Sequence, residues 1–145
     1  MEMKALFKRK ENMTGNTIVL QAKEQSDIVS DTINYIESYQ QFITGKLNHQ
    51  NYQLLISDFD SFYSNQKKVF GLINQKSFQL SSRLYELENN LPNQFMRISN
   101  TEIINLSKIK KFKLTTAGLI EIQLENGYST SSSRRFLKKV KERLL

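Results

Sequence analysis

The residues best suited to chemistry lie near the end of the chain, where a hydroxyl-rich run meets two adjacent arginines. The run covers residues 129–133, and Arg134 and Arg135 follow it where a basic helix is expected to begin. The N-terminus of a helix presents unpaired N–H groups that bind phosphate, and an arginine fork can grip a phosphate or a guanine edge through two hydrogen bonds. The segment therefore predicts a phosphate-bearing partner. Alternatively, Ser132 or Ser133 only caps the helix and the arginines are solvated.

The supply of nucleophiles and metal ligands argues against an enzyme. The chain has no Cys and one His, so thiolate sites, disulfides and imidazole clusters are excluded. That residue, His49, sits in a polar stretch typical of a hairpin tip. Asp58 and Asp60 could share one face of a strand, but Asp-x-Asp in a turn is usually a solvated connector. The five glycines are scattered and form no phosphate-binding loop. We predict no catalytic residue, metal, cofactor or small-molecule substrate.

The positive charge is confined to the last third of the chain. Residues 97–145 hold eleven Lys and Arg against four Asp and Glu, which accounts for the whole net charge of +7, whereas residues 1–96 hold ten of each. Lysines and arginines that neutralise phosphates release condensed counterions, so this asymmetry favours a polyanionic partner. Two other interpretations stay open. One is an adaptor whose basic face docks an acidic protein without nucleic acid; the other is a single-stranded RNA binder that stacks bases on Phe62, Tyr63 and Phe70.

Helical spacing of apolar residues appears at three places in the sequence. The first is residues 24–40, where Ser26 and Asp27 provide an N-cap. The second is residues 82–91, which Pro92 terminates. The third is residues 133–145, with an apolar stripe opposite a row of lysines.

Short β-favouring segments, separated by Asn, Gln, Asp and Ser, fill most of the remaining chain. Asn126-Gly127 is a strong hairpin signal, because both residues tolerate a positive φ. The strands are predicted at residues 17–22, 42–47, 52–56, 67–73, 77–80, 95–98, 103–106, 109–114 and 119–124. The pattern predicts a mainly β protein with short helices, of the α+β class.

Three blocks of sequence occur in a fixed order between residues 82 and 136. Residues 82–88 read SRLYELE, residues 95–105 read FMRISNTEIIN, and residues 124–127 (LENG) are followed by SSRRF at 132–136. Over residues 41–145 the chain thereby resembles the LytTR DNA-binding domain family. The resemblance implies an elongated arrangement of mostly antiparallel sheets, which reads duplex DNA through loops in successive major grooves, usually as two copies on a direct repeat.

The resemblance also implies which side chains contact DNA. It places base reading on Lys67, Asn100 and Arg134; the two cations suit guanine and the amide suits adenine. Arg97 has two interpretations, an internal ion pair or a phosphate contact. The expected phosphate contacts, which position the duplex without specifying sequence, are Thr101, Lys108, Lys110, Lys111, Ser133, Arg135 and Lys138.

Residues 1–40 precede the resembling region and are predicted to form a basic arm, a short strand and an amphipathic helix. The apolar face of that helix (Val29, Ile33, Ile36) either packs between two chains as a dimer contact or covers one end of the same chain's β-core. This segment is too short for a receiver domain, so the chain resembles the stand-alone LytTR regulators of bacteria. That likeness implies a cytoplasmic sequence-specific transcription factor, a homodimer at least on DNA, under the control of a partner protein that is often in the membrane.

Overall fold

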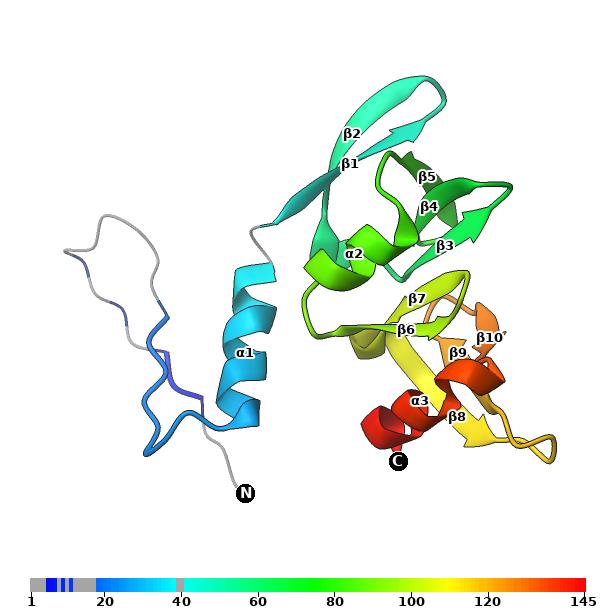
Figure 1. Ribbon diagram of the computed structural model, residues 1–145. Coiled ribbons are helices and arrows are strands. Elements are labelled where there is room, and N and C mark those ends of the chain that lie inside the picture. The colour runs from blue at the N-terminus through cyan, green and yellow to red at the C-terminus, as the bar shows by residue number, and fades with distance from the viewer. Residues whose placement is uncertain (1–4, 8, 10, 12–17, 39–40) are drawn as a thin grey trace.

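The structure is a computed structural model that describes residues 5–7, 9, 11, 18–38 and 41–145. It has three α-helices, three short 3₁₀ turns and ten strands within those residues (Figure 1). The helices are α1 (Asp27–Ser38), α2 (Leu84–Asn90) and α3 (Leu137–Leu144), and the 3₁₀ turns are η1 (Ile56–Asp58), η2 (Leu106–Lys108) and η3 (Arg134–Phe136).

The strands form two antiparallel sheets. The first sheet has seven strands in the order β2-β1-β5-β4-β3-β7-β6, and the second has three in the order β10-β9-β8. In chain order the strands are β1 (Phe42–Leu47), β2 (Gln50–Leu55), β3 (Ser61–Asn65), β4 (Lys68–Ile73), β5 (Lys76–Leu80), β6 (Phe95–Ser99), β7 (Glu102–Asn105), β8 (Ile109–Leu114), β9 (Ile120–Leu124) and β10 (Ser129–Ser131). The mainly β, α+β prediction is confirmed.

Strand β7 belongs to both hydrophobic cores, because successive side chains of a strand point to opposite faces. Ile103 packs in the first core, which lies under α2 with Phe59 and Phe62. Ile104 points the other way, into the second core. That second core joins β6 and β7 to β9 and α3 through buried side chains of Met96, Ile98, Ile120, Ile122, Leu124 and Val140.

The first core needs a glycine in β4. The Phe59 ring lies directly on the backbone of Gly71, where an added Cβ would come within 2.3 Å of the ring. Phe59 in turn stacks on Phe62 with ring centroids 4.7 Å apart. This packing fixes β3 against β4 and so fixes the direction of the hairpin that they form.

Several predicted boundaries hold and others are wrong. The strand expected at 17–22 is absent at residues 18–22, and Thr17 lies outside the described residues; an isolated strand there has no neighbour to pair its backbone groups. Two strands, β3 and β10, were not predicted. Both are short and contain two serines, and β10 (Ser-Thr-Ser) has no apolar residue, so the alternation of apolar and polar residues gave little signal for them.

The first helix occurs as predicted but is shorter. Helix α1 begins after Ser26, whose hydroxyl accepts a hydrogen bond from the Val29 N–H at 3.4 Å. Residues 39 and 40, which the prediction included, lie outside the described residues. The helix contacts the rest of the chain through Asp31, whose carboxylate accepts a hydrogen bond from the Asn93 amide at 3.1 Å. Among its described side chains none is buried, and Ile28 and Tyr35 are exposed.

Candidate nucleic-acid interface

Three turns that carry the predicted base-reading residues lie on one side of the molecule. They are the β3–β4 turn, the β6–β7 turn and the segment before α3, all on the right in Figure 1. Backbone hydrogen bonds connect them: the Ser64 N–H donates to the Thr101 carbonyl at 2.9 Å, and the Ser133 N–H donates to the Ile98 carbonyl at 2.9 Å. The structure therefore brings together Lys67, Asn100 and Arg134, all exposed, from positions 67 residues apart in sequence.

Lys67 occupies the second position of a two-residue hairpin turn. Gln66 and Lys67 have φ values of 49° and 65°, which is the left-handed region of both central residues in a type I′ turn. Glycine is favoured at the second position because it has no Cβ to strain. The same geometry recurs at His49 and Gln75, so the turn type by itself does not mark a functional residue. His49 is exposed at its hairpin tip, as predicted.

Arg97 holds the β6–β7 turn in place. Its Nη1 donates to Glu88 Oε2 at 2.9 Å, its Nε donates to the Ser99 carbonyl at 3.1 Å, and its Nη2 donates to the Asn100 carbonyl at 2.8 Å. All three guanidinium nitrogens are therefore committed within the chain. Of the two interpretations of Arg97, the internal ion pair is confirmed, and Glu88 is a structural partner rather than a free surface residue.

A side-chain hydrogen bond links the β6–β7 turn to the segment before α3. Arg135 Nη1 donates to Asn100 Oδ1 at 3.2 Å. The Phe136 ring lies beneath two guanidinium groups, with Arg97 5.7 Å and Arg135 5.6 Å from its centroid. Arg135 is thus held by a cation–π contact from below and by an amide at its side.

The hydroxyl-rich run has a different role from the one predicted. Ser132 is buried, and its hydroxyl accepts the Ile120 N–H at 3.1 Å, so it fastens the segment to β9 instead of capping a helix. Ser133 precedes a 3₁₀ turn without a side-chain cap, and its hydroxyl oxygen is buried with no hydrogen-bond partner. The α-helix begins only at Leu137, so Arg134 and Arg135 lie in the 3₁₀ turn η3 before it.

The other predicted phosphate contacts divide into two groups. Thr101 and Lys138 are exposed, in the β6–β7 turn and on α3 respectively. Lys108, Lys110 and Lys111 lie toward the other end of the second sheet, because the Lys108 carbonyl accepts the N–H of Glu125 in the β9–β10 turn. The structure therefore does not bring these three together with the turns. Strand β8 is also exposed along most of its length.

Lys113, which was not among the predicted contacts, lies closer to the interface. Lys113 pairs across strands with Glu121, which pairs with Ser131, two residues before Ser133. Its position follows from the register of β8, β9 and β10, and β10 was not predicted. No pattern in the sequence alone distinguishes it from Lys110 and Lys111.

A buried carboxylate joins the two sheets behind these turns. Glu102, on β7, accepts hydrogen bonds at Oε2 from the Tyr128 hydroxyl at 3.2 Å and from the Thr130 hydroxyl at 3.1 Å. Burial raises the pKa of the Glu102 carboxyl above its usual 4.5, more than these two hydrogen bonds lower it. Burial, and then the nearby Glu102 charge, raise the pKa of Tyr128 above its usual 10.0.

A second contact between the sheets shows that Asp60 is structural. The prediction of a solvated connector is wrong for this residue, which is buried. Its Oδ2 accepts the Asn74 N–H at 2.8 Å and the Asn126 amide at 3.1 Å, so it ties the first sheet to the β9–β10 turn. Asp58 is exposed, as a connector would be.

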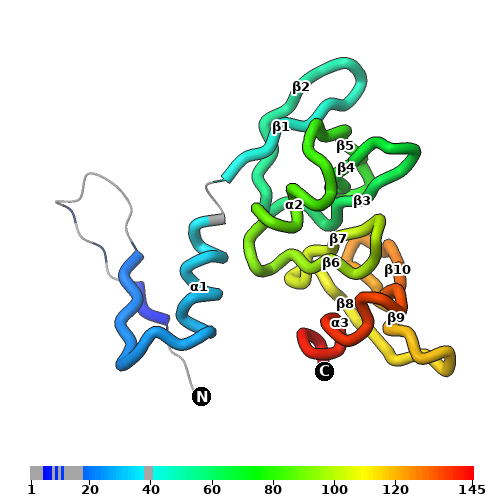
Figure 2. Tube along the Cα trace, in the orientation of Figure 1, coloured from blue at the N-terminus to red at the C-terminus, as the bar shows by residue number. Residues whose placement is uncertain are grey.

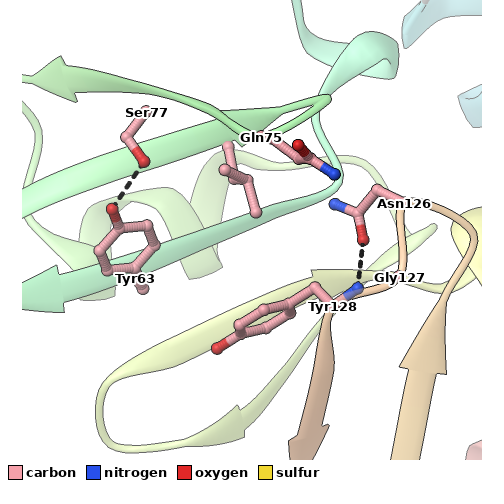
Figure 3. A pocket seen from close by; sticks show the side chains of 7 residues that line it. Tyr63, Gln75, Ser77, Asn126, Gly127 and Tyr128 are labelled. Carbon is pink, nitrogen blue, oxygen red and sulfur yellow. Dashed lines mark hydrogen bonds between the residues drawn. The ribbon is translucent and has the colours of Figure 1, made fainter.

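A cavity of about 570 Å³ opens beside this contact, at the ends of the strands opposite the Lys67 turn. Figure 3 shows Tyr63 and Ser77 of the first sheet on one side and Tyr128 of the hairpin on the other. Tyr63 donates to or accepts from Ser77 across 2.8 Å, and the Asn126 side chain accepts the Tyr128 N–H at 2.8 Å. These two bonds lie within the sheet and within the hairpin respectively, whereas the bonds of Glu102 and Asp60 cross between them and set how the hairpin, and hence the Arg134 segment, is placed on the first sheet.

Helices in this chain do not form a helix-turn-helix pair among the described residues, because strands separate all three (Figure 2). None of these helices is long and apolar enough to cross a membrane in the part of the chain that the structure describes. Recognition of a nucleic acid by the described residues would therefore rest on turns and 3₁₀ segments.

Comparison with known proteins gives a consistent result. The family model described as the LytTr DNA-binding domain matches residues 49–145. Proteins named HTH-type transcriptional regulators from Staphylococcus aureus strains MRSA252 and NCTC 8325 are 38% and 37% identical over 135 residues, and each alignment covers 92% of both chains. A solved LytTr DNA-binding domain from Bacillus cereus superimposes with a TM-score of 0.68 at 20% identity, over 71% of this chain and 95% of that one.

Proposed function

This chain belongs to the LytTR DNA-binding domain family and is a DNA-binding transcriptional regulator, and we propose that it reads duplex DNA through its three adjacent turns. In this proposal Lys67 and Arg134 contact guanine O6 and N7, and Asn100 contacts adenine N6 and N7. Thr101, Arg135 and Lys138 contact phosphates and set the register of the protein on the duplex.

One observation carries this proposal. The three turns lie together on one side of the chain, joined by the Ser64–Thr101 and Ser133–Ile98 backbone hydrogen bonds. Turns held by backbone bonds to a packed sheet present side chains in a fixed geometry, which base recognition requires. The alternative of a basic adaptor for an acidic protein finds no support in the comparisons.

Helix α1 favours a dimer as part of this proposal. Its stripe of Val29, Ile33 and Ile36 is only partly covered by its own chain, and Ile28 and Tyr35 beside it are exposed. A second chain on this stripe would bury apolar area that a single chain leaves in water. Two copies of the domain then occupy direct-repeat half-sites. Control by a membrane protein, which the resemblance implies, stays a prediction.

Selection of bound duplexes from a random pool, followed by footprinting of the winners, tests the proposal. We expect a defined sequence with two half-sites about one helical turn apart, roughly 10 bp, protected on one side of the duplex. Selection without enrichment of any sequence would contradict base reading. A single half-site bound by one chain would contradict the dimer while leaving base reading intact.

A further inference from the structure

A groove of about 490 Å³ lies beside the Lys67 turn, on the side toward α2. Its walls come from the β3–β4 hairpin, the end of β5 and the segment that leads into α2. Four cationic side chains line it: Lys67, Lys68, Arg83 and Arg97. Three serines, Ser64, Ser81 and Ser82, add hydroxyl groups to its lining. No acidic residue lines it among the residues described.

Three of these cations have no ion-pair partner among the residues that the structure describes. Arg97 is paired with Glu88 at 2.9 Å and is committed to the β6–β7 turn. Lys67, Lys68 and Arg83 are exposed, and none of their side chains forms an ion pair within 4.0 Å with a carboxylate of the described residues. The Glu86 carboxylate, in the first turn of α2, accepts the backbone N–H of Arg83 at 3.2 Å. A concave surface lined by one sign of charge focuses its field and attracts counter-ions of the opposite sign. The groove is therefore suited to an anion with more than one charge.

The position of the groove beside the Lys67 turn indicates which anion it binds. Lys67, at its edge, is the residue that we place in a major groove. A side chain that enters a major groove brings the protein surface next to it against the phosphates that border that groove. Lys68 and Arg83 lie on that surface, whereas Lys110 and Lys111 lie on β8 of the second sheet.

We propose that this groove binds the sugar–phosphate backbone of the duplex beside the base pairs that Lys67 reads, with Lys68 and Arg83 as the phosphate-contacting residues. This inference rests on the proposed function, and it assigns to these two residues a role in affinity that is independent of sequence. The protein would then contact further phosphates of the duplex on the side of Lys67 that faces away from Arg134.

The experiment compares two variants of the full chain by fluorescence anisotropy. The test variant is Lys68→Gln/Arg83→Gln, which removes both charges and keeps long polar side chains. The control is Lys76→Gln, an exposed lysine at the other end of the same β4–β5 region. Each protein is titrated at several NaCl concentrations with the best selected duplex and with a scrambled duplex of equal length.

We expect the slope of log K against log salt to become shallower by about 0.9 for each lost contact, so by nearly 2 for the double variant. Affinity for both duplexes should fall by the same factor, and the ratio between them should stay unchanged. Lys76→Gln should match the parent. Phosphate ethylation of the parent complex should interfere on the flank next to Lys67.

Two results would overturn the groove assignment. The first is a double variant whose slope and affinity match those of Lys76→Gln while it melts like the parent. The second is a double variant that binds the selected and the scrambled duplex with equal affinity, which would mean that Lys68 and Arg83 read bases. If the parent itself showed no preference between the duplexes, the proposed function would fail, and the slope comparison would still decide whether the groove holds phosphate.

Discussion

Arg135 donates a hydrogen bond to the side-chain oxygen of Asn100 at 3.2 Å, across 35 residues of sequence. The bond fixes the amide of Asn100, with its oxygen toward Arg135 and its NH₂ group free to face outward. A carbonyl oxygen has two lone pairs, so Asn100 Oδ1 can keep this bond while it accepts one from adenine N6. Arg135 is thus a positioning residue for Asn100, in addition to the phosphate contact that we propose for it.

The Asn100–Arg135 pair should be coupled in DNA binding. We expect Asn100→Ala to cost about 1–3 kcal/mol of discrimination at one base pair. Arg135→Ala should weaken binding to all duplexes and also reduce discrimination at that same base pair, because the amide is no longer oriented. A double-mutant cycle measured by competition binding gives the coupling energy. Strictly additive effects would show that Arg135 does not orient Asn100.

Lys67 should show opposite effects on stability and on binding. Glycine is favoured at its left-handed φ of 65°, so Lys67→Gly should raise the free energy of unfolding by about 0.5–1 kcal/mol and reduce sequence discrimination. The control is Gln75→Gly, which has a φ of 73° in the neighbouring turn. It should stabilise to a similar extent and leave DNA binding unchanged. Urea denaturation measures the change in stability, and competition binding measures the change in sequence discrimination. Unchanged discrimination in Lys67→Gly would show that Lys67 does not contact a base.

Arg97 should act through the fold of the β6–β7 turn. Arg97→Lys keeps the charge but cannot hold Glu88 and two carbonyl groups at once. We expect a loss of about 1–2 kcal/mol in the free energy of unfolding, together with weaker binding to every duplex. Glu88→Gln should cost less, because both backbone contacts survive. Normal stability with weak binding in Arg97→Lys would indicate a direct phosphate contact instead.

Glu102 should make stability depend on pH. Its pKa is raised in the folded chain, so between the usual value of 4.5 and the folded value the native state holds a proton that the unfolded chain has lost. Stability from this group is therefore full below about pH 4.5 and is lost as pH rises through the folded pKa. Glu102→Gln lacks this titration, so its stability relative to the parent should increase with pH across that window. A difference that stays constant from pH 4 to 8 in urea denaturation would refute this assignment.

The sequence predicted the elements better than it predicted how they meet. Spacing of apolar residues located α1, α2 and most strands, because one buried face leaves a periodic pattern. It could not show that Asp60 and Glu102 are buried between the sheets, since their partners across the sheets lie 66 residues away for Asp60 and 26 and 28 residues away for Glu102. Nor could it separate Lys113 from Lys110, because that choice depends on the register with β9 and β10. Neither Lys68 nor Arg83, which lies in the 82–88 block, was predicted to contact DNA, and only the groove that they share suggests this role.

Base reading by the turns is tested most directly by comparing Arg134→Ala with Lys138→Ala. Both side chains are exposed cations near the start of α3, so a purely electrostatic contact would treat them alike. The measurement is the ratio of affinities for the selected duplex and for duplexes with single base-pair changes. We predict that Arg134→Ala lowers this ratio at one position, by about 1–3 kcal/mol, while Lys138→Ala weakens binding to all duplexes equally and keeps the ratio. Equal, uniform weakening by both variants would contradict it.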